Sequence, residues 1–157
     1  MNHATPQRAT APKLLRRFLV AVGALATIVA CGHAPAHDGK HRPAANEFGS
    51  GPRASVSQLY VATLQVGEPL RKRRLQTVSV RVVDAAGRPV EHATIAVGGG
   101  MPEHGHGLPT QPRVSRMLGN GVYEIDGLRF NMSGWWELEL AIQAEAGTDT
   151  VTFNLDL

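Results

Sequence analysis

Apolar residues recur at every second position in four segments of this 157-residue chain, and this period constrains the fold more than any other feature. In residues 76–84 (QTVSVRVVD), Val78, Val80 and Val82 fall on one side of the segment. The same alternation runs through residues 91–97, 135–142 and 150–157. Because successive side chains of a strand point to opposite faces, each segment predicts a strand with one face in a core and one in water.

Three further segments, residues 58–66, 113–118 and 122–125, are also predicted strands, although their alternation is less regular. Turn-forming sequences rich in Gly, Asp and Asn separate them at residues 84–90, 119–121 and 145–149. About seven short strands in roughly 100 residues predict an all-β, immunoglobulin-like sandwich over residues 55–157. The alternation leaves the strand order open.

The N-terminus has the pattern of a bacterial export signal. Basic residues precede an uncharged run at residues 18–30, which is too short for a permanent membrane span but suits a signal peptide. The run ends in IVAC, residues 28–31, which resembles the lipobox of bacterial lipoproteins. We therefore predict a signal peptide at residues 1–30 and a lipidated Cys31. Ordinary signal cleavage and an uncleaved anchor are the alternatives.

Residues 31–54 are rich in Ala, Pro and Gly and lack apolar periodicity, so they predict a flexible tether. Removal of the signal peptide leaves twelve of the sixteen Lys and Arg against thirteen Asp and Glu, a net charge near −1. This balance argues against a nucleic-acid partner. One basic run, Arg71–Arg74, is either a solvated loop or a segment that attracts anionic lipid headgroups.

Residues 98–112 (GGGMPEHGHGLPTQP) bring Met101, His104 and His106 into six positions. In an extended chain, residues two apart project to the same side, so the two histidines can reach one ion together. Thioether and imidazole ligands favour copper, whereas zinc gains little from methionine. The alternative is a polar surface turn in which Met101 covers the open end of the sandwich. With Cys31 as the one cysteine, a metal site must use His, Met or carboxylate.

Three blocks in this order, residues 80–97, 101–114 and 119–142, resemble the YtkA-like/FixH-like family of exported bacterial β-sandwich domains. The resemblance covers about residues 56–157. It implies an immunoglobulin-like fold and a link to copper handling or respiratory-oxidase assembly. Met101, His104 and His106 fall on the family's Met-Pro…His-Gly loop, and Met132 falls on its Met-x-Gly-x-Trp segment. FixH-type proteins usually carry a transmembrane anchor, so the lipid anchor predicted here weakens transfer of the oxidase role.

Met132 completes a Met/His site if its segment packs beside the 101–106 loop. Otherwise it fills the core below that loop, with Trp136 inside the sandwich and Trp135 facing out. Catalysis has little support, because the sequence carries no phosphate-binding loop, HExxH motif or nucleophile elbow. We therefore do not expect an enzyme.

Together these features predict a lipid-anchored, periplasm-facing domain of the bacterial envelope that binds copper and delivers or buffers it. Gly32 after Cys31 favours the outer membrane if the host sorts lipoproteins as enterobacteria do. The alternative is a protein-interaction module without metal, which docks an envelope or respiratory-complex partner through a loop end or a strand edge.

Overall fold

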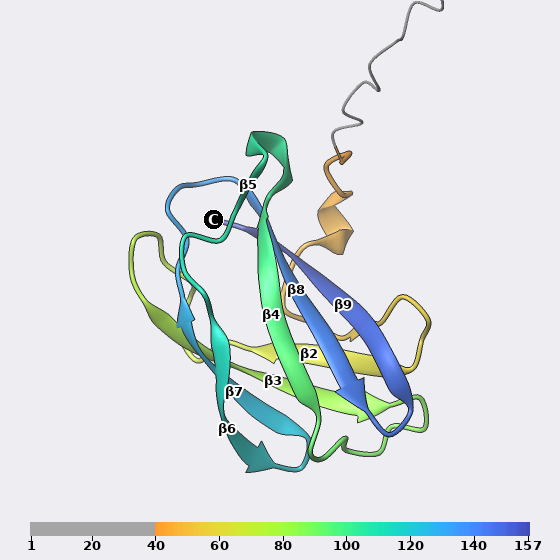
Figure 1. The fold of residues 1–157 in the computed structure, drawn as a ribbon. Coiled ribbons are helices and arrows are strands. Elements are labelled where there is room, and N and C mark those ends of the chain that lie inside the picture. The colour runs from red at the N-terminus through yellow and green to blue at the C-terminus, as the bar shows by residue number, and fades with distance from the viewer. Residues whose placement is uncertain (1–39) are drawn as a thin grey trace, which may run out of the picture. The chain divides into compact units, whose positions relative to one another are not determined.

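The computed structural model describes residues 40–157, and its strands form two antiparallel sheets packed face to face (Figure 1). The predicted signal peptide, Cys31 and residues 32–39 of the predicted tether lie outside the described residues. The strands are β1 (Arg53–Ala54), β2 (Tyr60–Gln65), β3 (Gln76–Asp84), β4 (Thr94–Met101), β5 (His106–Gly107), β6 (Arg113–Gly119), β7 (Val122–Leu128), β8 (Trp135–Ala144) and β9 (Gly147–Asp156). Two short 3-10 turns, η1 (Ala45–Glu47) and η2 (Pro102–His104), complete the elements.

The strand order is that of an immunoglobulin constant-type domain. One sheet runs β1-β2-β3-β7-β6 and the other runs β5-β4-β8-β9. Seven strands remain when the two-residue strands β1 and β5 are left out. One sheet then runs β2-β3-β7-β6, which are the first, second, fifth and fourth of the seven in chain order. The other sheet runs β4-β8-β9, the third, sixth and seventh, as in the ABED and CFG sheets of that domain. The predicted all-β, immunoglobulin-like sandwich is confirmed.

The predicted alternation is present in the core. Val78, Val80 and Val82 of β3 are each at most 2 % exposed, while Thr77 and Arg81 on the opposite face are exposed to solvent. The inner face of the second sheet supplies the opposing apolar side chains, which are Leu138, Leu140 and Ile142 from β8 and Val151, Phe153 and Leu155 from β9. Because both sheets bury one face, their registers are fixed by the burial of these side chains.

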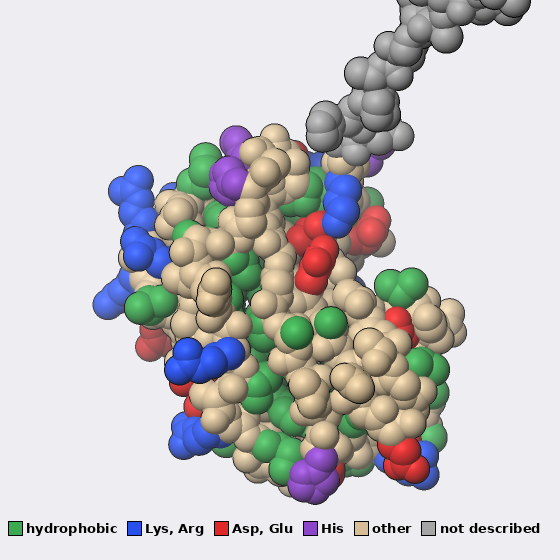
Figure 2. Space-filling model, in the orientation of Figure 1, with side chains coloured by type: hydrophobic (Ala, Val, Ile, Leu, Met, Phe, Trp, Pro, Cys, Tyr) green, Lys and Arg blue, Asp and Glu red, His purple; other side chains and the backbone are tan. Residues whose placement is uncertain are grey.

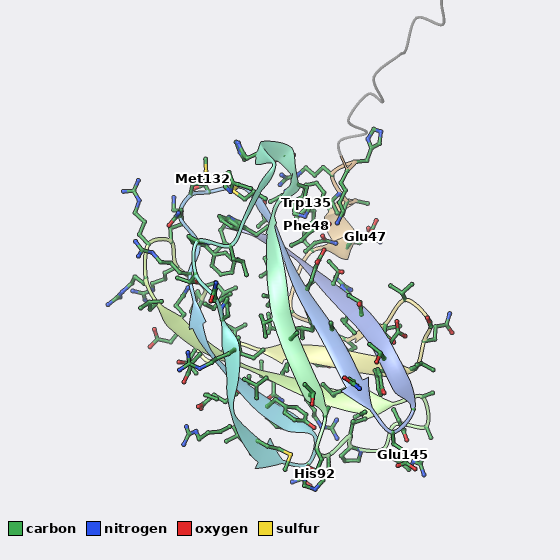
Figure 3. All side chains as sticks on the ribbon, viewed as in Figure 1. Glu47, Phe48, His92, Met132, Trp135 and Glu145 are labelled. Atoms are coloured by element: carbon green, nitrogen blue, oxygen red, sulfur yellow. The ribbon has the colours of Figure 1, made fainter. Side chains whose placement is uncertain are left out.

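Part of the predicted tether packs against the second sheet. Phe48 forms a parallel bridge with Asn154 of β9, and the amide of Gly49 donates to the Asn154 carbonyl at 2.8 Å. Trp135 faces away from the core, as predicted, yet it is only 1 % exposed. Figure 3 shows it beside Phe48 and Glu47. Residues 45–49 therefore cover the outer face of β8 and β9 at this end.

The helical content of residues 40–157 is limited to the two three-residue turns. In this part of the chain we find no helix with the length and apolar character needed to cross a membrane.

Candidate metal centre

Three connections meet at one end of the sandwich, which we call the Met/His end. They are the β2–β3 loop (residues 66–75), the segment between β4 and β6 (residues 102–112) and the β7–β8 loop (residues 129–134). Figure 1 shows the β4–β5 turn and the β7–β8 loop side by side there. The antiparallel order of the strands brings these distant segments of the sequence together.

A tight turn reverses the chain after Met101. Pro102 begins the η2 turn, and Gly105 ends it with a left-handed φ of 66°, a conformation that glycine adopts at no steric cost. The Gly105 amide donates to the Met101 carbonyl at 3.0 Å. The sequence MPEHGH therefore folds as a hairpin, so residues 104–106 do not have the extended conformation that would set both histidines on one side.

This hairpin sets Met101 directly opposite His106, as cross-strand partners of β4 and β5. Directly opposite residues of an antiparallel pair project to the same face, with their Cβ atoms about 5 Å apart. The His104 ring stacks on the His106 ring, with 5.7 Å between centroids and 22° between planes. The predicted convergence of Met101, His104 and His106 on one end of the sandwich is thus present, although it arises from a turn.

Aromatic rings form the floor of this cluster. The His106 centroid lies 6.1 Å from that of Trp136, which in turn packs edge-on against Phe130 at 5.2 Å. The Met101 side chain is 1 % exposed and belongs to the core, and its Cε approaches the backbone of Gly134. The thioether is therefore buried, whereas both imidazoles lie on the surface.

Met132 reaches the same end from the β7–β8 loop but does not fill the core. Its side chain is 39 % exposed, and its carbonyl accepts a hydrogen bond from Trp136 Nε1 at 3.1 Å. Figure 3 shows its side chain at the surface beside the η2 turn, with His92 at the opposite end of the molecule. Met132 therefore lies near the rim without the cross-strand pairing that joins Met101 to His106.

Ion pairs border the cluster on the β8 side. Glu137 and Lys40 line one surface pocket with Met101 and His106, and Lys40 Nζ lies 2.6 Å from Glu137 Oε2. This hydrogen bond to Glu137 raises the pKa of Lys40. Arg42 pairs with Glu103 of the η2 turn at 3.5 Å and with Asp156 at 3.2 Å. The sequence offered no signal for these pairs, because Lys40 and Glu137 are 97 positions apart.

The donor set limits which cation fits. Among residues 40–157, no three His, Cys, Asp or Glu side chains come together as a metal-binding group. A site at the Met/His end therefore has two imidazoles as nitrogen donors and depends on thioether sulfur for a third ligand. Zinc prefers three or four His, Cys or carboxylate ligands, whereas Cu(I) accepts thioether sulfur, so the residues present fit copper better than zinc.

Comparison with known proteins identifies the family. No curated protein and no solved structure matches the chain. The model of the YtkA-like family matches residues 55–141, which are more than half of the 157 residues, and the chain therefore belongs to the YtkA-like family.

Proposed function

We propose that this YtkA-like domain binds Cu(I) at the Met/His end and buffers it or passes it to another envelope protein. Family membership suggests an envelope-associated domain, which fits a role outside the cytoplasm. The observation that carries the proposal is the cross-strand pairing of Met101 with His106, with the His104 ring stacked on that of His106.

The arrangement suits a soft monovalent cation. Met101 supplies a sulfur donor that the core holds in place, since the side chain is almost fully buried. His104 and His106 supply nitrogen donors from the surface, where they can rotate to enclose the cation. Met132, on the adjacent loop, supplies a second thioether as an exchangeable ligand.

The exposure of the histidines also supports transfer. A cation bound below two surface imidazoles is open to an incoming ligand from an acceptor protein. A fully enclosed site would instead retain its metal. The site geometry therefore supports a buffer or a donor of copper more than a permanent structural metal site.

The membrane anchor is part of the proposal and rests on the leader sequence. We propose that Cys31 is lipidated and that the domain faces the periplasm, with the outer membrane favoured by Gly32. Mass spectrometry of the envelope-purified protein tests this point, because acylated Cys31 becomes the N-terminal residue after cleavage.

The copper proposal is tested by Cu(I) titration of the purified protein against a chromophoric chelator. We expect a Kd of about 1 μM or lower, together with quenching of tryptophan fluorescence, because Trp136 lies against His106. The His104→Ala/His106→Ala variant loses both signals. His92→Asn is the matched control, because His92 lies at the opposite end of the molecule and asparagine tolerates its φ of 57°.

Equal Cu(I) affinity in the wild-type protein and the double variant removes the proposal. In that case the non-metal interaction module is the remaining function. Co-purification of an envelope partner that survives both chelation and the double substitution supports that alternative.

A further inference from the structure

The β2–β3 loop carries a run of four cations followed by an exposed apolar side chain. Arg71, Lys72, Arg73 and Arg74 are consecutive and exposed, and the next residue, Leu75, is 67 % exposed. Figure 2 shows Lys and Arg side chains gathered at the left edge of the molecule, where Figure 1 draws this loop. We call residues 71–75 the basic loop.

The basic loop is fixed to the Met/His end by its contacts with the β7–β8 loop. Lys72 forms a parallel bridge with Phe130, and its Nζ donates to Ser133 Oγ at 2.5 Å. The Arg73 amide donates to the Phe130 carbonyl at 2.6 Å. The neighbouring Arg129 adds a further cation, and within the described residues its buried Nε has no hydrogen-bond acceptor.

The charges at this end are not balanced. The acidic side chains near Met101 and His106 are already paired, Glu137 with Lys40 and Glu103 with Arg42. For the basic loop, the ion pair found in the described part of the chain joins Arg71 to Glu68 at 3.9 Å. The loop therefore presents an excess of positive charge to whatever lies beyond this end.

The described chain also begins at this end. Lys40, the first residue that the structure describes, pairs with Glu137 beside Met101 and His106. Position 40 lies nine steps along the chain from position 31, a length that spans at most about 30 Å when fully extended. This step rests on the lipidation of Cys31 proposed above, which would hold residue 40, and with it the Met/His end, within that distance of the bilayer.

We propose that the basic loop docks on an anionic bilayer surface, so that the Met/His end faces the membrane. Lys and Arg side chains near anionic headgroups are attracted to the negative surface potential of the bilayer, and the attraction increases with their number. Leu75 is placed to enter the interface between headgroups and acyl chains. An acidic protein would pair with the cations, but its charge would not account for the exposed side chain of Leu75. This proposal does not depend on copper binding at the site.

Hydrogen–deuterium exchange of the full chain on vesicles tests the proposal. The readout must come from the loop, because the apolar run at residues 18–30 can itself hold the chain on vesicles. We expect amides 70–76 to exchange more slowly on phosphatidylcholine vesicles that contain phosphatidylglycerol than on phosphatidylcholine alone. High salt reduces this difference.

Neutralisation of the loop, as Arg71→Gln/Lys72→Gln/Arg73→Gln/Arg74→Gln, should reduce the protection by at least about tenfold. The control variant, Arg81→Gln/Arg88→Gln/Arg113→Gln/Arg116→Gln, makes the same change in net charge on β3, β6 and the β3–β4 connection and keeps the protection. A charge-retaining variant, Arg71→Lys/Arg73→Lys/Arg74→Lys, should also keep the protection of amides 70–76. This variant separates an effect of charge from an effect on folding.

Equal protection on both kinds of vesicle overturns the proposal. So does protection that survives neutralisation of the loop. Protection that appears only when an acidic envelope protein is added, and not on anionic vesicles, also overturns it and assigns the surface to a protein partner.

Discussion

At the scale of single residues, packing by Met101 can be separated from the copper ligation proposed for it, because the side chain lies in the core and its residue is paired across the strands with His106. Met101→Leu keeps the volume and removes the sulfur, so we expect the free energy of unfolding to fall by less than about 1.5 kcal/mol. We expect Cu(I) affinity to fall much more. Urea unfolding and chelator competition on the same variant measure the two effects.

Met101→Ala is the comparison for this prediction. It leaves a cavity in the core beside Gly134 and should cost about 2–5 kcal/mol of stability. If Met101→Leu binds Cu(I) as tightly as the wild-type protein, Met101 is a packing residue only.

The residue types in the sequence predicted which side chains lie close together, but not the backbone conformation that brings them there. Methionine and histidine with copper-binding chemistry were visible in the 101–106 loop, and their convergence was predicted. The sequence argument considered the geometry of an extended segment for His104 and His106, whereas Pro102 and Gly105 favour a turn there. Burial was less predictable, since Met101 is enclosed while Met132 is exposed. That difference depends on tertiary packing, which no local pattern encodes.

At the scale of elements, β4 pairs closely on both sides because it lacks side chains where the neighbouring backbones approach. A Cβ on Gly100 would lie 2.3 Å from the His106 carbonyl oxygen. Gly100→Ala should therefore disrupt the β4–β5 pairing and weaken Cu(I) binding, although every donor remains in the chain. Gly98→Ala is the matched control, because a Cβ there meets no atom within 4 Å.

Titration and hydrogen–deuterium exchange of the two variants measure this effect. The amides of β8 and β9 stay protected in Gly100→Ala, whereas those of residues 105–108 exchange faster. Unchanged Cu(I) affinity in Gly100→Ala would mean that the hairpin geometry is irrelevant to binding.

The segment around Phe48 supports a second prediction at this scale. Phe48 lies under the Arg42 guanidinium, 5.1 Å from the ring centroid, and bridges to Asn154. Phe48→Ala should release residues 40–49 from the sheet and expose Trp135, which shifts tryptophan emission to longer wavelength. Adding Trp135→Phe should abolish the shift, and a shift that persists in the double variant assigns the change to Trp136 instead.

The strands were the most predictable elements. A period of two, visible in β3 and β9, follows from burial on one face, so sequence alone located the core side chains. Strand pairing and the packing of residues 40–54 were not predictable, because they rest on contacts between distant positions. The bridge between Phe48 and Asn154 has no counterpart in the local pattern of a segment rich in Ala, Pro and Gly.

At the scale of the whole molecule, Asp149 joins the two sheets at the end opposite the Met/His end. Its carboxylate lies at the start of β9 and accepts hydrogen bonds from the amides of Ser57 at 2.9 Å and Thr150 at 2.8 Å. The Ser55 hydroxyl, followed by the backbone amides, lowers the pKa of Asp149 below its ordinary value of 3.8. The charged carboxylate therefore favours the folded state.

The pH dependence follows from the sign of this shift. A carboxyl group with a lower pKa when folded contributes its stabilisation above the unfolded pKa and loses it as the pH falls through the folded pKa. At neutral pH, Asp149→Asn should therefore unfold at lower urea than the wild-type protein, and the difference should shrink as the pH falls below about 4. Glu145→Gln is the control, because Glu145 is exposed in the turn between β8 and β9 at the same end of the molecule (Figure 3). A difference between wild type and Asp149→Asn that stays constant from neutral pH to pH 2 would show that the charge of Asp149 does not hold the two sheets together.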